Sequence, residues 1–332
     1  MTYKLICLAL SISAGSVIAA PQKLDLSLEQ ISVSGLSSGG YMANQFHLAH
    51  SDWVTKVGII AAGPYYCAQG SIKTALEQCV NQVLSPIDLN HLNSVANTYA
   101  TEEKISPLIN LKKSKVWLFH GANDNKVKQE VSDALYEQYA DLAGKENVKY
   151  VNDQATSHLF PTLSEGSDCQ QSVSPYIGNC QYDAAGEMFG YLFDDFAVRV
   201  DTPQGQIVEL DQQQLGGESA STLADLAYAY VPKSCAAGES CSLHISFHGC
   251  NQNSQSVGTQ YAQLSGLNNW ADNNRMVVLY PQTKNSTFMP LNPQGCWDWW
   301  GYTGAEYATQ HGQQIQAVTH MARSLQHYAI QQ

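Results

Sequence analysis

The sequence predicts an α/β fold with a mostly parallel sheet and helices on both of its faces. Short apolar runs bounded by turn residues alternate with segments of helical periodicity. One apolar run enters a Gly-x-Ser-x-Gly turn that leads directly into a helical pattern. Strands that alternate with helices usually form parallel sheets covered on both faces. Because no repeat, low-complexity tract or Pro/Ser-rich linker interrupts the chain, we expect one domain over residues 21–332.

The expected elements follow from these patterns. Strands are predicted at residues 31–36, 57–62, 116–120, 148–152, 243–248 and 276–280. Helices are predicted at residues 40–50, 130–143, 261–273 and 313–330. The stretches 67–111 and 169–214 are less regular, and we interpret them as insertions or lids beside a site.

Composition excludes one class of partner. The chain of 332 residues carries a net charge of −12 and only 17 basic residues, without a Lys/Arg block. Nucleic-acid binding requires a basic surface that neutralises phosphates. We therefore expect a neutral substrate and no nucleic acid. Separately from the charge, we expect no metal, no cofactor and a monomer.

Residues 1–20 have the pattern of an export signal. Lys4 supplies the positive charge, residues 5–12 are apolar, and small residues precede Pro21. The apolar run is shorter than the ~20 residues that a membrane-spanning helix needs. No later segment is apolar enough to span. We expect a secreted protein, extracellular or periplasmic.

Cysteine usage agrees with export. Removal of the signal would leave eight cysteines, and an even number in an exported chain indicates disulfides. A zinc site would need paired Cys-x-x-Cys or Cys/His spacings, which are absent. Sequence proximity favours the pairs Cys67–Cys79, Cys169–Cys180 and Cys235–Cys241, which leaves Cys250 and Cys296 for the fourth pair.

The turn Gly35-Leu36-Ser37-Ser38-Gly39 is the most informative segment. A strand–turn–helix with glycines two residues either side of a serine is the nucleophile elbow of the α/β-hydrolase fold. The following helix N-terminus stabilises negative charge that develops on a substrate oxygen. Ser38 is a rival nucleophile, but the residue two positions before it is the bulky Leu36. Ser37 is therefore the predicted nucleophile.

A serine nucleophile needs a carboxylate and a histidine later in the chain. Asp124 follows the strand 116–120, at the sheet edge where such sites form, and Asp153 is its competitor. His158 follows the strand 148–152 and is the predicted base. His120, His47 and His50 look structural.

The oxyanion loop is expected before the nucleophile, but too few residues precede Ser37 to supply it. A candidate lies far downstream, where the strand 243–248 ends in His248-Gly249-Cys250. The predicted helix 313–330 is the last element of the strand–helix alternation, and no strand follows it. If this helix is joined conceptually to residues 28–31, a complete helix–strand–elbow unit results. We infer a circular permutation that opens the chain just before the nucleophile strand.

These four motifs together resemble the poly(3-hydroxybutyrate) depolymerase family, in its circularly permuted, single-domain extracellular form. They are the elbow at 35–43, the segment 119–124, the segment 157–161 and the segment 247–252. The resemblance covers nearly the whole chain after the signal. It implies the triad Ser37, Asp124 and His158, and an oxyanion hole from the backbone N–H groups of Ser38 and Cys250.

The resemblance also implies the substrate, a short-chain polyhydroxyalkanoate or its oligomers. Trp297, Trp299, Trp300 and Tyr302 resemble the aromatic segment beside the family's crevice, and exposed aromatic rings suit an apolar chain. Feruloyl and acetylxylan esterases share the broader family and remain the nearest alternative. A secreted binding protein without catalytic activity is a third reading, against which the complete triad argues.

Overall fold

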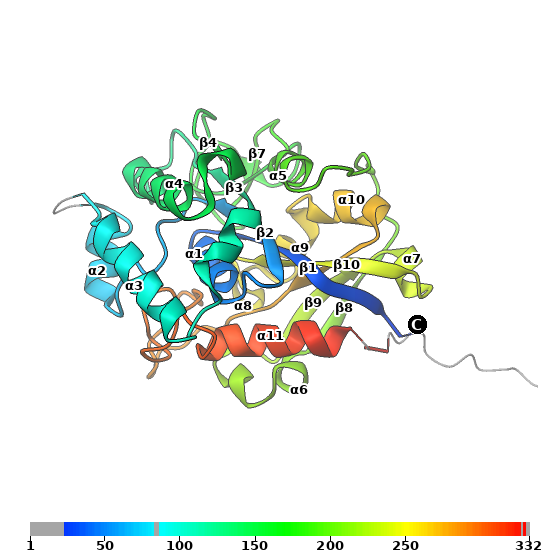
Figure 1. The fold of residues 1–332 in the computed structure, drawn as a ribbon. Coiled ribbons are helices and arrows are strands. Elements are labelled where there is room, and N and C mark those ends of the chain that lie inside the picture. Colours follow the sequence, from blue (N-terminus) through cyan, green and yellow to red (C-terminus); the bar gives the residue numbers. More distant parts are fainter. Residues whose placement is uncertain (1–22, 83–85, 327, 330–332) are drawn as a thin grey trace, which may run out of the picture.

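An eight-stranded sheet forms the centre of the molecule, in the order β4-β3-β2-β1-β10-β11-β9-β8 (Figure 1). The computed structural model describes residues 23–82, 86–326 and 328–329. Neighbours from β4 through β11 run parallel, whereas β9 is antiparallel to both β11 and β8. The strands are β1 Asp25–Leu36, β2 Val54–Ile60, β3 Lys115–Phe119, β4 Val148–Val151, β8 Gln206–Asp211, β9 Leu226–Val231, β10 Ser240–Phe247 and β11 Met276–Tyr280.

The two halves of the chain meet where β1 pairs with β10. Ser34 lies opposite Ser246 and Gly35 opposite Phe247, so the strand 243–248 adjoins the nucleophile strand as predicted. The end of the chain also returns to its beginning, because the Leu24 amide donates to the Tyr328 carbonyl at 3.0 Å. Helix α11 runs beside the first part of β1 (Figure 1). The permuted connectivity inferred from the sequence is therefore the one observed.

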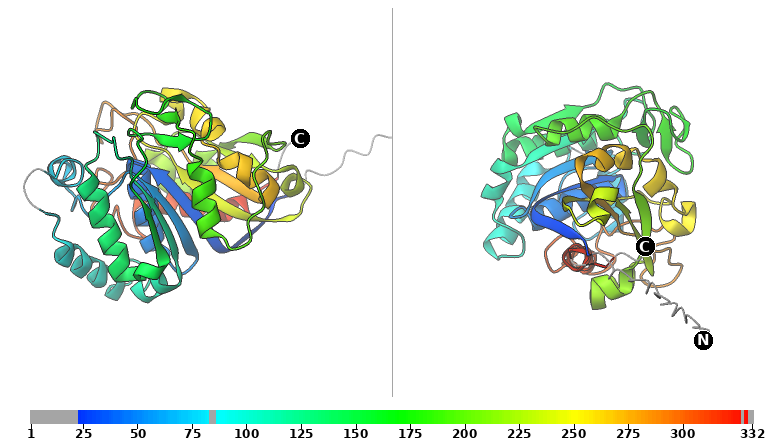
Figure 2. Two further views of the ribbon diagram at one scale, coloured as in Figure 1. Left: turned by 90° about the horizontal axis from the view of Figure 1, so that it is seen from above. Right: turned by 90° about the vertical axis from the view of Figure 1, so that its right-hand side faces the viewer.

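Helices cover both faces of the sheet (Figure 2). Apolar side chains of α1, α4 and α11 form one core with the sheet, and those of α5, α9 and α10 form a second core on the opposite face. The alternation of strand and helix in the sequence produces these two layers. The bounds of these helices are α1 Ser38–Ala49, α4 Gln129–Ala143, α5 Ala184–Leu192, α9 Gln260–Leu264, α10 Leu267–Ala271 and α11 Gln313–Leu325. Shorter or peripheral helices are α2 Ile72–Gln78, α3 Leu89–Thr101, α6 Gln212–Gly216, α7 Lys233–Ala236 and α8 Ser254–Val257.

Three expectations need correction. The helix predicted at 261–273 is divided into α9 and α10, because Gly266 between them has a φ of +78° that a helix cannot contain. The stretch 169–214 is not wholly an insertion, since its last residues form the edge strand β8. The predicted last helix ends at Leu325 rather than at residue 330.

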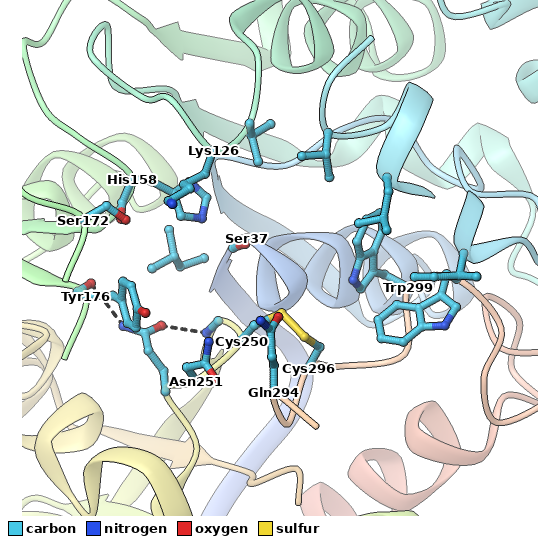
Figure 3. Close-up of a pocket in the computed structure, with 18 residues that line it drawn as sticks. Ser37, Lys126, His158, Ser172, Tyr176, Cys250, Asn251, Gln294, Cys296 and Trp299 are labelled. Carbon is cyan, nitrogen blue, oxygen red and sulfur yellow. Dashed lines mark hydrogen bonds between the residues drawn. A yellow bond between two sulfur atoms is a disulfide. The ribbon is translucent and has the colours of Figure 1, made fainter. Parts of the chain in front are cut away.

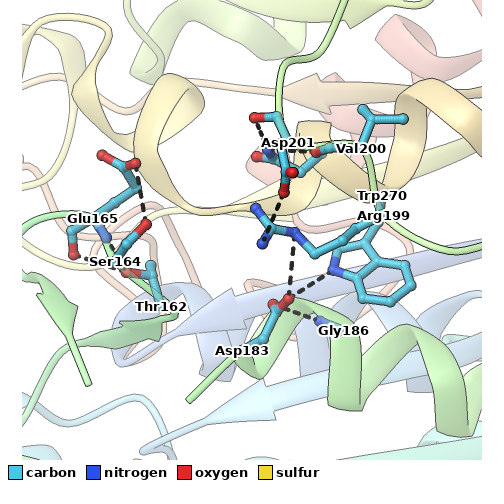
Figure 4. A network of polar contacts seen from close by, with 10 residues as sticks. Thr162, Ser164, Glu165, Asp183, Gly186, Arg199, Val200, Asp201 and Trp270 are labelled. Carbon is cyan, nitrogen blue, oxygen red and sulfur yellow. Dashed lines mark hydrogen bonds and ion pairs between the residues drawn. The ribbon is translucent and has the colours of Figure 1, made fainter. Parts of the chain in front are cut away.

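The rest of residues 169–214 is attached to the central sheet by a small three-stranded sheet and by ion pairs. Strands β5 Phe160–Thr162, β6 Ser167–Asp168 and β7 Ile177–Asn179 form the second sheet, in the order β5-β7-β6. Arg199 lies between Asp183 and Asp201, at 3.9 Å and 3.6 Å (Figure 4). Asp183 also accepts hydrogen bonds from the Trp270 indole and the Gly186 amide. This network fastens the segment before β8 to α5 and α10.

The disulfides connect the three pairs that sequence proximity favours and the fourth pair that they leave. They join Cys67 to Cys79, Cys169 to Cys180, Cys235 to Cys241 and Cys250 to Cys296. The predicted export signal, including Cys7, lies outside the described residues. Within the described part of the chain, no helix is long and apolar enough to cross a membrane.

Candidate active site

Ser37 occupies the turn between β1 and α1 in a backbone conformation that side chains rarely adopt. Its φ is +58° and its ψ is −121°. A non-glycine residue in this region is held there only by its surroundings. The Ser37 amide donates to the Ile60 carbonyl at 2.9 Å, and the Ser37 carbonyl accepts from the Tyr41 amide at 3.0 Å. These bonds fix the serine at the start of the helix, as the elbow motif predicts.

The two glycines of the motif each permit a close backbone contact. A Cβ on Gly35 would lie 2.0 Å from the Gly39 carbonyl oxygen, and a Cβ on Gly39 would lie 2.1 Å from the Phe247 carbonyl oxygen. Gly35 therefore lets the turn close tightly on itself. Gly39 lets the start of α1 touch the end of β10. The elbow thus meets the loop that sequence reasoning selected for the oxyanion.

His158 Nδ1 donates to Asp124 Oδ2, with 2.7 Å between the two atoms. The Asp124 side chain is fully buried, and that of His158 is 10% exposed. Asp124 Oδ1 accepts from the amides of Lys126 and Val127 at 2.8 Å and 3.0 Å. Burial would raise the pKa of Asp124, but the hydrogen bond and charge of His158 and these two amides outweigh it, so its pKa lies below the usual value. The carboxylate is ionised and oriented to hold the imidazole.

The competing acid and histidines lie elsewhere. Asp153 is exposed and accepts a hydrogen bond from the neighbouring Gln154 side chain. His120 is buried against the Ser132 hydroxyl, and burial lowers its pKa. His47 and His50 are buried at the opposite end of α1 from the elbow turn, and they are hydrogen-bonded to Ser114 and Thr319 among others.

The turn after β10 lies beside Ser37. A Cβ built on Gly249 would be 3.5 Å from the Ser37 Cβ. The Gly249 amide donates to Gln252 Oε1 at 2.7 Å, and the Asn251 amide donates to the Gln294 carbonyl at 2.7 Å. Cys250, between these two, is fastened by its disulfide to Cys296. The turn is therefore held rigidly next to the nucleophile.

His248 stabilises this turn from below as a neutral imidazole. Burial lowers its pKa to about 4, although the hydrogen bond to the Gly249 carbonyl works in the opposite direction. Its Nδ1 lies 2.7 Å from the Gly249 oxygen, and its Nε2 accepts from the Thr283 amide at 3.2 Å. One nitrogen donates and the other accepts, which only the neutral ring can do.

Ser37 and His158 line one cavity of about 330 Å³. Figure 3 shows His158 and Trp299 on opposite sides of Ser37, with the Cys250–Cys296 disulfide at the near edge. Leu36, Val80 and Val127 contribute to an apolar lining that continues to Ile72 and Leu76 of α2. A second, mostly apolar depression adjoins it, lined by Ile72, Leu76, Trp300 and the loop 289–293.

The aromatic segment divides into buried and accessible residues. Trp299 and Trp300 line the cavity, and Trp300 and Tyr302 line the adjoining depression. Trp297 is 0% exposed and packs edge-on against Phe247 beneath the site. The expectation that Trp297 contacts substrate is wrong, because no part of its side chain reaches a surface. A run of tryptophans in the sequence does not reveal which of them points inward.

Other lining residues were not predicted. Gln252 ties the turn to the segment before β7, since its Nε2 donates to the carbonyls of Pro175 and Tyr176 at 2.8 Å and 3.1 Å. Lys126 lines the cavity near His158. Its position two residues after Asp124 was the only signal available. Among the described residues, no group of three or more His, Cys, Asp or Glu side chains is arranged to hold a metal ion.

Comparisons with known proteins identify the family to which the chain is similar. A family model described as esterase PHB depolymerase matches residues 226–327. The chain is 40% identical over 314 residues to a poly(3-hydroxybutyrate) depolymerase of Delftia acidovorans, covering 92% of this chain but 62% of that protein. It is 34% identical to a polyhydroxybutyrate depolymerase of Talaromyces funiculosus, with 89% of each chain covered.

Two solved structures resemble the chain closely. One is a PHB depolymerase from Penicillium funiculosum, with a TM-score of 0.85, 32% identity, and coverage of 94% of this chain and 99% of the other. The second is a serine-to-alanine PHB depolymerase complexed with an R3HB trimer, also with a TM-score of 0.85 and 32% identity, covering 92% and 98%.

Proposed function

This chain belongs to the poly(3-hydroxybutyrate) depolymerase family, and we propose that it hydrolyses the ester bonds of short-chain polyhydroxyalkanoate or its oligomers. The observation that carries the proposal is the cavity itself. A strained serine and a histidine paired with a buried carboxylate open into an apolar, aromatic-lined space. An ester polymer is neutral and apolar, and such a chain suits a site with few charges.

The proposed mechanism assigns one role to each member of the triad. Ser37 Oγ attacks the ester carbonyl carbon while His158 Nε2 accepts the serine proton. Asp124 holds Nδ1 and stabilises the imidazolium. The tetrahedral intermediate collapses when the carbon–oxygen bond to the alcohol breaks and His158 gives its proton to that alcohol. Water, deprotonated by His158, then attacks the acyl-enzyme. The bond between the acyl carbon and Ser37 Oγ breaks, His158 returns the proton to Ser37 Oγ, and the acid is released.

Two backbone amides are proposed as donors to the oxyanion. Ser38 is the first residue of α1, and the first amides of a helix have no acceptor within it. Cys250 belongs to the turn that Gly39 and Gly249 allow to approach Ser37. Donors held in place before reaction stabilise the developing charge without reorganisation. The Ser38–Cys250 pair therefore takes the role of the oxyanion hole.

Trp299 offers a further polar contact to an ester chain. Its side chain lines the cavity and is 7% exposed, and its indole nitrogen has no hydrogen-bond partner among the described residues. A buried donor without a partner is costly. This nitrogen is itself buried, so a substrate carbonyl would satisfy it only where the bound chain reaches the indole edge. Trp300 and Tyr302 would extend the apolar contact along the chain.

We also propose that residues 1–20 act as an export signal and that the protein works outside the cytoplasm. Four disulfides in the described chain support this, because such bonds persist in oxidising compartments.

A substrate panel tests the proposed function. Purified protein is given hydroxybutyrate trimer methyl ester, amorphous polymer film, methyl ferulate and acetylated xylan, with the Ser37→Ala variant as the blank. We expect the trimer and the film to be hydrolysed and the two plant-type esters to be poor substrates. Faster turnover of methyl ferulate or acetylated xylan than of the trimer would replace the polyester assignment with a plant-polymer esterase.

A further inference from the structure

Lys126 has no ion-pair partner among the described residues, and it lines the cavity that contains Ser37. Among the described residues that line the cavity with Ser37, it is the only Lys or Arg, and no Asp or Glu lies among them. The interior of a neutral ester chain offers no negative charge to pair with this ammonium group. The role of Lys126 therefore has to involve another part of the substrate.

The backbone of Lys126 is fixed relative to the proposed catalytic pair. Asp124 uses Oδ2 to hold His158 and Oδ1 to accept the Lys126 amide at 2.8 Å. The neighbouring Val127 amide donates to the same oxygen. One carboxylate therefore positions both the imidazole and the start of the lysine side chain. In Figure 3, Lys126 and His158 lie on the same side of Ser37.

The side of the cavity on which Lys126 lies indicates which part of the substrate it contacts. His158 is the group that protonates the leaving alcohol, so the leaving fragment lies on its side of Ser37. In a polyester of a hydroxy acid, the fragment that leaves as the alcohol ends in the free carboxyl group of the chain. When that fragment is short, its carboxylate lies close to the imidazole.

We infer that Lys126 binds the terminal carboxylate of hydroxy-acid oligomers and so favours cleavage near the carboxyl end of the chain. This inference rests on the proposed function and adds a specificity-determining residue to it. An ammonium group attracts a carboxylate more strongly beside an apolar wall than in open solvent. Because Lys126 is itself exposed, the preference is modest, roughly two- to fivefold in kcat/KM.

The test compares one oligomer in two forms. The hydroxybutyrate trimer is supplied as the free acid and as its methyl ester, and the ratio of the two kcat/KM values is measured at neutral pH. We expect the native protein to prefer the free acid by roughly two- to fivefold at low ionic strength. Lys126→Gln should bring the ratio to about one, and Lys126→Arg should retain the preference because it keeps the charge.

Lys128→Gln is the matched control, since this exposed lysine does not line the cavity, and it should leave the ratio at the native value. A measurement on the native protein alone covers the case of a variant that does not fold. Raising the ionic strength from about 0.01 M to about 1 M shortens the Debye length from ~30 Å to ~3 Å and should abolish the preference.

The outcomes separate the two proposals. Hydrolysis of both trimers with a ratio that neither Lys126→Gln nor salt changes would overturn the role of Lys126 and leave the esterase proposal intact. An equal loss on both trimers in Lys126→Gln would also overturn it, since that pattern indicates a structural role. If neither trimer is hydrolysed, the proposed function itself fails.

Discussion

Trp299 stacks on Tyr41, with ring centroids 4.5 Å apart and ring planes inclined by 17°. Tyr41 belongs to the first turns of α1, four residues after Ser37, and it is buried. The stack therefore couples the wall of the cavity to the helix that carries the nucleophile. It also fixes the plane of the indole, and with it the position of the buried N–H, which has no partner among the described residues.

Trp299→Phe tests whether that N–H binds the substrate. Phenylalanine keeps a ring against Tyr41 but removes the donor, and a hydrogen bond of this kind contributes about 0.5–1.5 kcal/mol. We expect kcat/KM for the hydroxybutyrate trimer to fall by roughly two- to tenfold. Hydrolysis of nitrophenyl acetate, which has no second carbonyl to bind, should change little.

Trp117→Phe is the control for this experiment. Trp117 also has a buried indole nitrogen without a partner among the described residues, but it lies in the opposite core and lines no part of the cavity. Its replacement should leave both rates unchanged. An equal loss on trimer and nitrophenyl acetate in Trp299→Phe would contradict a substrate contact.

Ser37→Ala and Ser38→Ala separate the nucleophile from its neighbour. Loss of the triad nucleophile should reduce kcat on the order of a millionfold, as in other serine hydrolases. Ser38→Ala keeps the backbone amide proposed for the oxyanion. It removes only a hydroxyl that accepts from the Trp297 amide at 3.4 Å, so its effect on nitrophenyl ester turnover should be far smaller. Equal losses in the two variants would refute the elbow assignment.

The sequence correctly predicted those elements whose local residue pattern reflects their place in the fold. The buried strand before Ser37, the glycines of the turn and the His-Gly-Cys turn each carry a backbone requirement that is visible in the residues. β8 was missed because it is an edge strand with one buried residue out of six, which leaves no apolar run. Periodicity alone cannot recognise such a strand.

Side-chain direction was the second limit of sequence reasoning. Trp297 and Trp299 both lie in the aromatic segment, yet one packs under β10 and the other lines the cavity. That difference depends on loop geometry set by Asp298, whose carboxylate accepts from the amides of Gly301, Tyr302 and Thr303. Such hydrogen bonds form only in the folded loop, so the residue pattern alone does not predict which tryptophan is buried.

Buried histidines should make the protein sensitive to mild acid, and among them His47 and His244 have the lowest pKa values. His47 is hydrogen-bonded to Tyr139 and Ser114, and His244 to Ser32 and Ser34. Burial lowers the pKa of each to about 3. In the unfolded chain the pKa is about 6.5, so below that value the unfolded state binds more protons. The stability is fully present above about pH 6.5 and is lost as the pH falls towards 3.

Urea unfolding at several pH values between about 7 and about 5 measures this loss. Each such histidine contributes roughly 1.4 kcal/mol per pH unit once the pH is well below 6.5. His244→Gln removes one titrating group and keeps a polar side chain, so the slope of its unfolding free energy against pH should decrease by one histidine's share. An identical slope in the variant would show that His244 is not the group that titrates.

The Cys250–Cys296 disulfide should support both stability and catalysis, because it fastens the turn beside Ser37 to the aromatic segment across 46 residues. Replacing both cysteines by serine should cost ~4 kcal/mol of unfolding free energy by the loop-entropy relation. Displacement of a positioned group by about 1 Å can cost ~10²-fold in rate, so kcat on a nitrophenyl ester should fall by up to that amount.

The matched control is the Cys235–Cys241 pair, which closes a loop of 6 residues and lines no part of the cavity. Its double serine variant should lose ~2 kcal/mol and keep its kcat. If both variants lose stability but neither loses activity, the turn holds its position without the disulfide, and the bonds around Gly249, Asn251 and Gln252 suffice.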